Sequence, residues 1–361
     1  MHRLSVAGLM TIAMTCGAAA ETITVALDGS GDHDNIQNAI DAAVDGDEIL
    51  VMPGTYYGSG DGWIFETDGK AIHLRSDQGA DKTIIDGQNF YRCFVCRDYE
   101  GPDTIIDGFS FINGVIFPTD VDGNGTIEWW DQCGGGGLLY LDANPTIANC
   151  RFVGNTAAGG YNGGALGLLF YCSPTITNCS FENNSAPSDG GAIFASTWCN
   201  ATLSGCSFEG NTAGGNGGAF KAGGRGTLIF ESCTVRGNTA GNEGGGLFLG
   251  NCPTSLSFSM VCGNAPDQIA SGDWDDVIGN LVADSCPVMG ACCTTQCVEQ
   301  ASEADCLRFG GIWYGDGSVC DDITCDGGGG NDDCPADING DDVVGVDDLL
   351  MLLSEFGNVC P

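Results

Sequence analysis

The sequence is poor in basic residues. Lysine and arginine together number 11 in 361 residues, against 48 aspartates and glutamates, which gives a formal net charge of -37 at pH 7. Nucleic acids and anionic membrane surfaces attract cationic proteins and repel a chain of this charge. The composition therefore excludes nucleic acid as an expected partner, disfavours an unassisted grip on a polyanionic sugar, and suits the binding of divalent cations.

Histidine and long apolar runs are also scarce. The only histidines are His2, His33 and His73. They are too scattered to accompany the cysteines in a zinc site or in a cysteine–histidine catalytic pair. No apolar stretch reaches the roughly 20 residues that a membrane-spanning helix needs. The sequence thus predicts no membrane span and no zinc chemistry.

The first 20 residues resemble a secretory signal peptide. Arg3 precedes a short apolar segment, and Ala18-Ala19-Ala20 supplies the small residues of a cleavage site. We therefore expect an exported protein, secreted or held at the cell surface, whose mature chain begins at Glu21.

Glycine, by contrast, is abundant, with 59 residues, and much of it recurs at a fixed period between residues 135 and 264. The second glycine of each Gly-Gly pair is Gly136, Gly164, Gly191, Gly218 or Gly245. A second block, an apolar residue followed three positions later by asparagine, recurs with nearly the same period of about 27 residues; its asparagines are Asn155, Asn184, Asn211, Asn238 and Asn264. A fixed period of this length is typical of stacked units that each bury a face against the next.

Each unit holds two or three short apolar or alternating runs, separated by glycine, asparagine and serine. Such runs favour strands with tight turns. The sequence therefore predicts an all-β fold, a right-handed parallel β-helix, and not a propeller, whose blades need four strands and about 40 residues. Within it, Phe152, Phe181 and Phe208 should form an aromatic column in the core, and the asparagines should hydrogen-bond turn backbone that would otherwise be buried unpaired.

The ordered Gly-Gly and Phe-x-x-Asn blocks resemble the repeats of the polymorphic outer-membrane protein family, which are β-helical surface adhesins. The resemblance covers residues 135–264, although Val235 and Val261 replace phenylalanine in the last two copies. It implies a solenoid that displays a surface for adhesion.

The beginning of the mature chain predicts the start of the solenoid. Residues 22–26 and 48–52 have the pattern of strands, and the segment between them predicts a helix capped by Asp32 or Asp34. The apolar face of that helix consists of Ile36, Ile40, Ala43 and Val44. The words IQNAIDAA and GDEILVMPGTY resemble the N-terminal segment of pectate-lyase-like right-handed β-helix proteins, which implies that the helix covers the open end of the solenoid.

The pentapeptide TIIDG occurs twice, once ending at Gly87 and once at Gly108. It predicts two successive coils in which Asp86 and Asp107 stack, or nearly so. A carboxylate pair could perform the acid–base chemistry of a glycosidase. A turn-forming Asp-Gly is the commoner explanation of such a pattern.

Residues 117–133 interrupt the repeat with the pattern of a twelve-residue calcium loop. Its predicted ligands are Asp120, Asp122, Asn124, Thr126 and Asp131. Aspartate replaces the usual glutamate at the last position, which shortens the reach of that side chain. Trp129 and Trp130, beside the loop, could stack on sugars or simply pack.

The cysteines of the solenoid are periodic as well. Those that precede the apolar block are Cys150, Cys179, Cys206 and Cys233. Coils about 4.8 Å apart bring equivalent cysteines within disulfide range, and export makes disulfides chemically plausible. Cys172 with Cys199 is the predicted bridge, and packing as small reduced side chains is the alternative.

Three further segments follow the predicted solenoid of residues 21–285. Residues 286–325 hold clustered cysteines and predict a compact disulfide-rich module, and residues 326–333 form a Gly/Asp linker. Residues 334–361 resemble one half of a type I dockerin, a calcium loop followed by a helix, which implies a cohesin-like partner. Its predicted calcium ligands are Asp337, Asn339, Asp341, the carbonyl of Val343, and Asp348, with Cys334 and Cys360 as a flanking disulfide.

Two classes of function fit these features. The favoured one is a secreted or cell-surface scaffold, stabilised by calcium, that serves a structural or adhesive role or binds extracellular polysaccharide or another cell-surface component. The alternative is a polysaccharide lyase or glycoside hydrolase. Lyase chemistry needs a basic residue beside calcium, and Lys221 and Arg225 form the one close basic pair in the repeats.

Overall fold

The computed structural model describes residues 20–58, 60, 62–116, 120–272, 274–286, 289–293, 297–302 and 312–316. The predicted signal peptide up to residue 19 and the whole dockerin-like tail, with its calcium ligands, Cys334 and Cys360, lie outside the described residues. The chain divides into two compact units, Met1–Ser285 and Cys286–Pro361.

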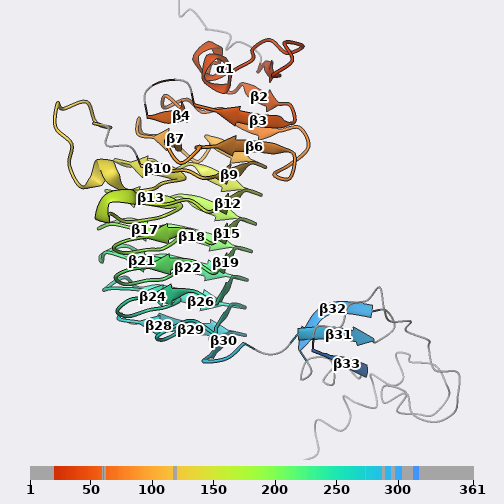
Figure 1. Cartoon of the computed structure of the whole chain (residues 1–361), viewed down its shortest axis with the longest axis vertical. Helices are drawn as coiled ribbons and strands as arrows, with labels where there is room; N and C mark the ends of the chain where they lie inside the picture. The colour runs from red at the N-terminus through yellow and green to blue at the C-terminus, as the bar shows by residue number, and fades with distance from the viewer. Residues whose placement is uncertain are drawn as a thin grey trace, which may run out of the picture. The chain divides into compact units, whose positions relative to one another are not determined.

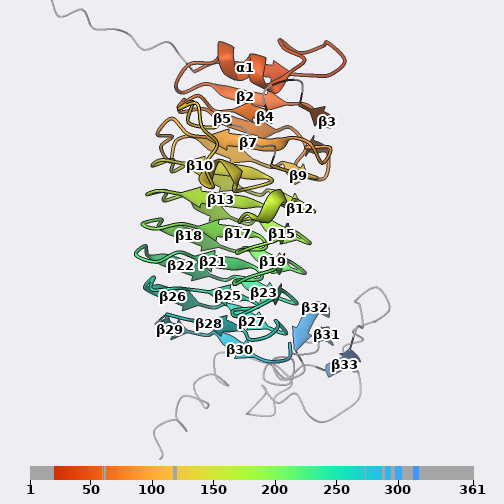
Figure 2. The same ribbon diagram turned by 60° about the vertical axis from the view of Figure 1, so that its left-hand side comes forward.

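The first unit is a parallel β-helix with three long sheets (Figures 1 and 2). Sheet A contains, in order, β1 (Thr22–Val25), β2 (Glu48–Val51), β5 (His73–Ser76), β8 (Ile105–Asp107), β11 (Thr146–Ala148), β14 (Thr175–Thr177), β18 (Ala201–Ser204), β22 (Leu228–Glu231), β26 (Thr254–Ser257) and β29 (Trp274–Ile278). Sheet B contains β3 (Gly54–Tyr57), β6 (Thr83–Asp86), β9 (Ser110–Ile112), β12 (Arg151–Val153), β15 (Ser180–Glu182), β19 (Ser207–Glu209), β23 (Thr234–Arg236), β27 (Met260–Cys262) and β30 (Leu281–Ala283).

Sheet C completes each coil. It contains β4 (Trp63–Glu66), β7 (Arg92–Cys96), β10 (Gly137–Tyr140), β13 (Leu166–Leu169), β17 (Ile193–Ala195), β21 (Phe220–Ala222), β25 (Leu247–Phe248) and β28 (Ile269–Ala270). A short fourth sheet pairs β16 (Ser185–Ala186), β20 (Thr212–Ala213) and β24 (Thr239–Ala240). Along the chain, each coil runs from sheet C through A to B, so equivalent residues of successive coils lie above one another.

This register stacks identical side chains in the core. Phe152 pairs with Phe181, and Phe181 with Phe208. Their ring centroids are 4.9 and 4.6 Å apart, with ring planes within 5° of parallel. Phe111 extends the column at 4.9 Å from Phe152. The predicted aromatic column is therefore present and fully buried.

The five repeat asparagines form a buried ladder beside this column. In all five, the side-chain amide donates to a backbone carbonyl of the preceding coil. In the first four, it also donates to the amide oxygen of the next asparagine. The same oxygen also accepts the backbone N–H of the preceding asparagine. Gln268 ends the ladder by bonding Asn264. Turn backbone that is closed off from water is thereby paired, as the sequence predicts.

Helix α1 (Ile36–Ala42) lies at the N-terminal end of the stack and packs against β1, β2 and β4. Its cap differs from the prediction, because the side chain of Asn35 accepts the N–H of Asn38. Asp32 instead accepts hydrogen bonds from Thr24. The helix ends before Val44, whose side chain is exposed.

The two TIIDG copies lie in different sheets. The first is β6 in sheet B, and the second leads into β8 in sheet A. Asp86 therefore faces Ile112, whereas Asp107 pairs in register with Arg75. The predicted stacking of Asp86 on Asp107 is wrong, because identical pentapeptides occupy different positions in their coils.

The periodic cysteines serve as turn donors. The thiols of Cys150, Cys179, Cys206 and Cys233 each bond the carbonyl two residues earlier, at 3.1 to 3.5 Å. Ser259 does the same in the next coil. Cys172 and Cys199 are also free, buried thiols, so the predicted bridge between them is not formed. Cys262 and Cys286 are disulfide-bonded.

In the second unit, the described residues form a small antiparallel sheet with the order β32-β31-β33. Its strands are β31 (Met289–Cys293), β32 (Cys297–Ser302) and β33 (Ile312–Asp316). Across both units, none of the helices that the structure describes is long and apolar enough to cross a membrane.

The asparagine ladder gives a first prediction. Asn211→Ala removes the acceptor of the Asn184 backbone and side-chain amides and the donor to the Phe181 carbonyl. Each unpaired buried group costs about 1–3 kcal/mol, so we expect a loss of roughly 3–5 kcal/mol in the free energy of unfolding. Urea and thermal unfolding measure it. Asn242→Ala, at an exposed turn position, is the control and should change stability by less than about 0.5 kcal/mol; equal effects would contradict the role of the ladder.

Candidate functional site

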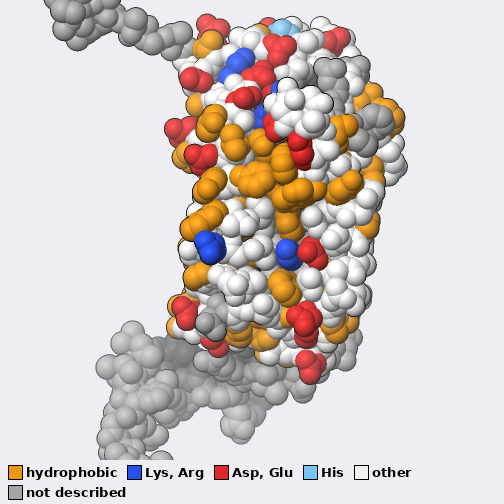
Figure 3. Space-filling view, turned by 90° about the vertical axis from the view of Figure 1, so that its left-hand side faces the viewer, with side chains coloured by type: hydrophobic (Ala, Val, Ile, Leu, Met, Phe, Trp, Pro, Cys, Tyr) orange, Lys and Arg blue, Asp and Glu red, His pale blue; other side chains and the backbone are white. Residues whose placement is uncertain are grey.

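The outward face of sheet C carries a second hydrophobic cluster, separate from the core. Side chains alternate between the faces of a strand, so each strand of sheet C also presents residues away from the solenoid interior. The buried members of this cluster are Val95, Val121, Cys133, Leu138, Tyr140, Leu169 and Phe194. Figure 3 shows hydrophobic side chains gathered over the middle of this side of the molecule.

The predicted calcium-loop insertion builds this cluster by folding against sheet C. Its end forms the short helix η1 (Trp130–Gln132). The ring of Trp130 lies 5.8 Å from that of Phe170, and Trp129 lies 6.1 Å from Phe170 and 6.4 Å from Phe194. Trp130 packs, while Trp129 remains 43% exposed. One tryptophan therefore anchors the insertion, and the other offers an aromatic surface to solvent.

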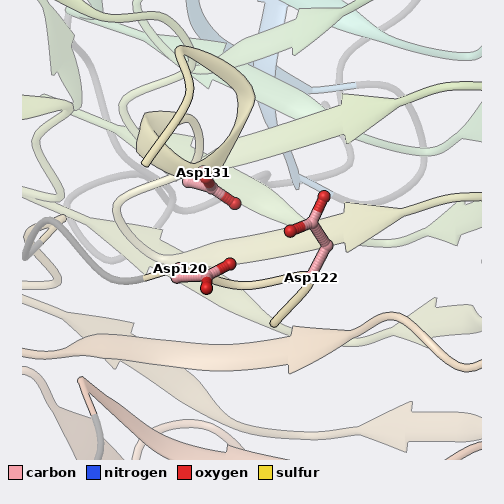
Figure 4. Close-up of side chains that lie close together, drawn as sticks. All are labelled: Asp120, Asp122 and Asp131. Carbon is pink, nitrogen blue, oxygen red and sulfur yellow. The ribbon is translucent and has the colours of Figure 1, made fainter. Parts of the chain in front are cut away.

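The insertion brings three carboxylates together. Oxygen atoms of Asp120, Asp122 and Asp131 lie within 4.8 Å of one another (Figure 4). Asp131 is fully buried, and this burial raises the pKa of its carboxyl group. Among the described residues, no lysine, arginine or histidine side chain forms an ion pair with any of the three. Carboxylates that face one another without a basic partner repel each other, and such an arrangement suits the binding of a cation.

Local hydrogen bonds hold these carboxylates in place. Asp131 accepts the N–H groups of Val121 at 3.1 Å and Glu128 at 2.8 Å, which closes the loop on itself. Tyr140 of β10 donates its hydroxyl to Asp122 at 3.3 Å and ties the loop to sheet C. The backbone of the loop therefore positions the acidic oxygens before any ion binds.

Two arginines fix the insertion from behind. Arg92, only 1% exposed, donates to the carbonyls of Asp131, Cys133 and Gly134 at 2.7 to 3.0 Å. Its burial lowers the pKa of the guanidinium to about 10, so it stays charged at neutral pH. Arg97 donates to the carbonyl of Val121 and pairs with Glu66 at 2.7 Å. Both arginines donate to backbone carbonyls of the insertion, and neither forms an ion pair with the acidic cluster.

Of the five ligands that the sequence predicts here, the structure brings the three aspartates together. The side-chain amide of Asn124 donates to Asp122, and the backbone N–H of Thr126 donates to Asn124, so both of these predicted ligands bond within the same loop. Glu128, which was not predicted, accepts from both Thr126 and Asn124. It occupies the ninth position of the twelve-residue loop, where oxygen ligands often act through water. This position could have identified Glu128 as a candidate ligand from the sequence.

The structure does not bring the predicted basic pair to the acidic cluster. Lys221 lies on β21, three strands along sheet C from β10, or roughly 14 Å at the usual strand spacing. Its ammonium group is 3.3 Å from Asp189 and 4.7 Å from the ring of Phe194. Arg225 lies in the following turn, with its guanidinium 5.6 Å from the ring of Trp198.

A surface hollow of about 440 Å³ lies between helix α1 and sheet C. Its lining includes Gln37, Asn38, Trp63, Glu66 and Arg97. Glu66 is buried there, and this burial raises the pKa of its carboxyl group even though Arg97 pairs with it. No sequence pattern indicated this acid, because its burial depends on contacts between distant segments.

The comparisons with known proteins establish the family. Residues 69–260 match the family model "Right handed beta helix region", and the chain belongs to this family. No curated protein matches the chain.

Three of the solved structures that match the chain do so at low identity. Pectate lyase Pel9A is 15% identical, with 73% of this chain and 67% of that chain covered and a TM-score of 0.47. The pectin methylesterase from carrot is 14% identical, with 73% and 82% covered and a TM-score of 0.39. The pectin methylesterase from Aspergillus niger is 12% identical, with 74% and 91% covered and a TM-score of 0.35.

The buried arginine gives a second prediction. Arg92→Met removes three charge-assisted hydrogen bonds and leaves three carbonyls of the insertion unpaired. We expect a loss of about 3 kcal/mol in the free energy of unfolding and a changed near-ultraviolet circular dichroism of the tryptophans. Arg236→Met, which breaks an exposed ion pair with Glu209, should cost less than about 1 kcal/mol. Equal losses in the two variants would argue against the role of Arg92 in holding the insertion.

Proposed function

We propose that the protein is a secreted, calcium-stabilised β-helix scaffold that binds extracellular polysaccharide, or another cell-surface component, through the outward face of sheet C. The observation that carries this proposal is the half-exposed ring of Trp129, which an acidic loop holds over aromatic residues of a rigid sheet. Amphipathic aromatic rings displayed on rigid elements suit recognition, because little conformational entropy is lost on binding.

The acidic cluster supports calcium as the ion of this face. Calcium prefers carboxylate and carbonyl oxygens, and Asp120, Asp122 and Asp131 supply three converging carboxylates. Glu128 adds a further carboxylate at the outer side of the loop. These residues fit the ion, which would neutralise their charge and tie the loop that carries Trp129 to its place on sheet C.

The state of the basic residues favours binding over lyase chemistry. A catalytic base must be free to take a proton. Of the predicted basic pair, Lys221 is paired with Asp189, and Arg225 holds its guanidinium over the ring of Trp198. Near the acidic loop, Arg92 is buried and Arg97 is bonded to Glu66 and to the loop backbone.

A second candidate function, that of a glycoside hydrolase, is favoured by Glu66. A buried carboxyl group with a raised pKa, beside Trp63 in an open hollow, has the character of a general acid. If this function holds, the protein should release reducing ends from a polysaccharide, and Glu66→Gln should abolish that release.

Calcium should raise the melting temperature of the purified chain, and chelation should reverse the effect. Asp122→Ala should abolish most of the increase because it removes one converging carboxylate, whereas Asp34→Asn, at an exposed acidic position, should retain it. The same calcium response in wild type and in Asp122→Ala would contradict this site.

The calcium response should also depend on pH. Because burial raises the pKa of Asp131, protons should compete with calcium for this carboxylate at a higher pH than they would for an ordinary aspartate. Without calcium, the folded chain binds that proton more readily than the unfolded chain does, so this group contributes stability as the pH falls through the window. The difference between the melting temperatures measured with and without calcium should therefore shrink as the pH falls.

The binding function is tested with pectate, alginate, chondroitin and xylan, each in calcium and in chelator. We expect retardation of the protein in gels that contain at least one polymer, with an affinity lowered tenfold or more by Trp129→Ala and unchanged by Tyr57→Ala, an exposed aromatic on sheet B. Unsaturated products and reducing ends are followed in parallel. If the protein degrades a polymer and Lys221→Ala or Glu66→Gln abolishes that activity, the protein is an enzyme and the scaffold proposal is wrong.

A further inference from the structure

A row of unusual residues follows sheet C at the turn that leads into sheet A. Asp142, Tyr171, Trp198 and Arg225 each precede by four positions the mutually paired residues of β11, β14, β18 and β22. They therefore occupy the same position on successive coils, about 4.8 Å apart. We call these four residues the turn row.

The two aromatic members of the turn row are turned toward solvent. Tyr171 is 57% exposed and Trp198 is 45% exposed. Their ring planes lie within 15° of parallel, with centroids 6.4 Å apart. The guanidinium of Arg225 extends the row at 5.6 Å from the ring of Trp198. The row thus offers two aligned rings along the solenoid axis, bounded by a carboxylate at one end and a guanidinium at the other.

The fold itself gains little from these residues. All four have left-handed backbone, with φ between 66° and 70°. Side chains other than glycine, asparagine and aspartate rarely adopt this region, and Tyr171, Trp198 and Arg225 each cost about 1–2 kcal/mol there. Glycine occupies left-handed positions at many other turns of this solenoid without that cost. Tyr171 and Trp198 place two such exposed rings on consecutive coils, parallel to within 15°, and this paired arrangement indicates a role outside the fold.

We propose that the turn row binds a neutral polysaccharide chain laid along the solenoid axis. Sugar rings present C–H faces that pack on aromatic rings, and their hydroxyls bond to carboxylates and guanidinium groups. A row with one side chain per coil suits a linear polymer of repeating units. The net charge of -37 opposes a polyanion, and the opposite charges of Asp142 and Arg225 favour a hydroxyl-rich, uncharged chain.

This inference rests on the proposed function, because it names the class of polysaccharide, and it adds a second contact surface. Arg225, which sequence reasoning offered as a catalytic base, acts here as a binding residue. Within the described part of the chain, no carboxylate forms an ion pair with Arg225, so its guanidinium can meet hydroxyls.

The experiment measures affinity electrophoresis of the full chain in gels that contain hydroxyethylcellulose, galactomannan, xylan or polygalacturonate. The test variants are Tyr171→Gly and Trp198→Gly, which relieve the backbone strain and remove the rings. We expect each to lower the association constant for a neutral polymer tenfold or more, with a melting temperature equal to or above that of wild type. Phe258→Gly is the control, because Phe258 is 59% exposed and has a φ of 50° at a different turn; its binding should not change.

Three results would contradict binding of a neutral polysaccharide by the turn row. They are undiminished binding in both test variants, retardation of the wild type by polygalacturonate alone, and no retardation of the wild type by any neutral polymer. Trp129→Ala in the same gels separates the two proposals. If binding is lost in Trp129→Ala but retained in Trp198→Gly, the turn-row proposal is wrong and the proposal for the sheet C face is supported. Binding that requires Trp198 but neither Trp129 nor calcium would support the row and overturn the sheet C face.

Discussion

The asparagine ladder is the constraint on which the rest of the solenoid depends. Each turn after sheet B buries backbone groups that water cannot reach, and one asparagine per coil pairs them while bonding the next asparagine. The ladder requires equivalent residues to stack directly, and this requirement fixes the register of the neighbouring sheets. The phenylalanine column and the thiol donors of the opposite turn follow from the same register. One repeated interaction thus specifies the interior.

A closed and repetitive interior leaves function to the places where the repeat is broken. The insertion that ends at Cys133 is the largest break among the described residues, and Arg92 joins it to the core through three backbone carbonyls. The acidic cluster and Trp129 are therefore held against the solenoid core by the hydrogen bonds of Arg92. The turn row is a subtler departure, because it keeps the coil length and replaces small residues by aromatic ones. Both lie on the outside, where substitution leaves the ladder intact.

The sequence predicted what is periodic and local. The β-helix, the phenylalanine column, the bonding role of the asparagines and the meeting of three loop aspartates all follow from spacing alone. It could not place the two TIIDG copies, because a strand's sheet depends on turns that precede it. It missed Arg92 and Glu66, whose roles arise from burial by distant segments. It also paired Cys172 with Cys199 on distance, although buried reduced thiols serve the same coil geometry.

The central claim is that calcium orders the insertion, whereas the solenoid is already rigid without calcium. Hydrogen–deuterium exchange of the whole chain, in calcium and after chelation, tests it peptide by peptide. The account predicts slower exchange in calcium for residues 120–133 and their contacts on β10 and β13, with unchanged protection of the asparagine-ladder amides. Exchange in residues 120–133 that ignores calcium, or a change spread evenly over all coils, would contradict it.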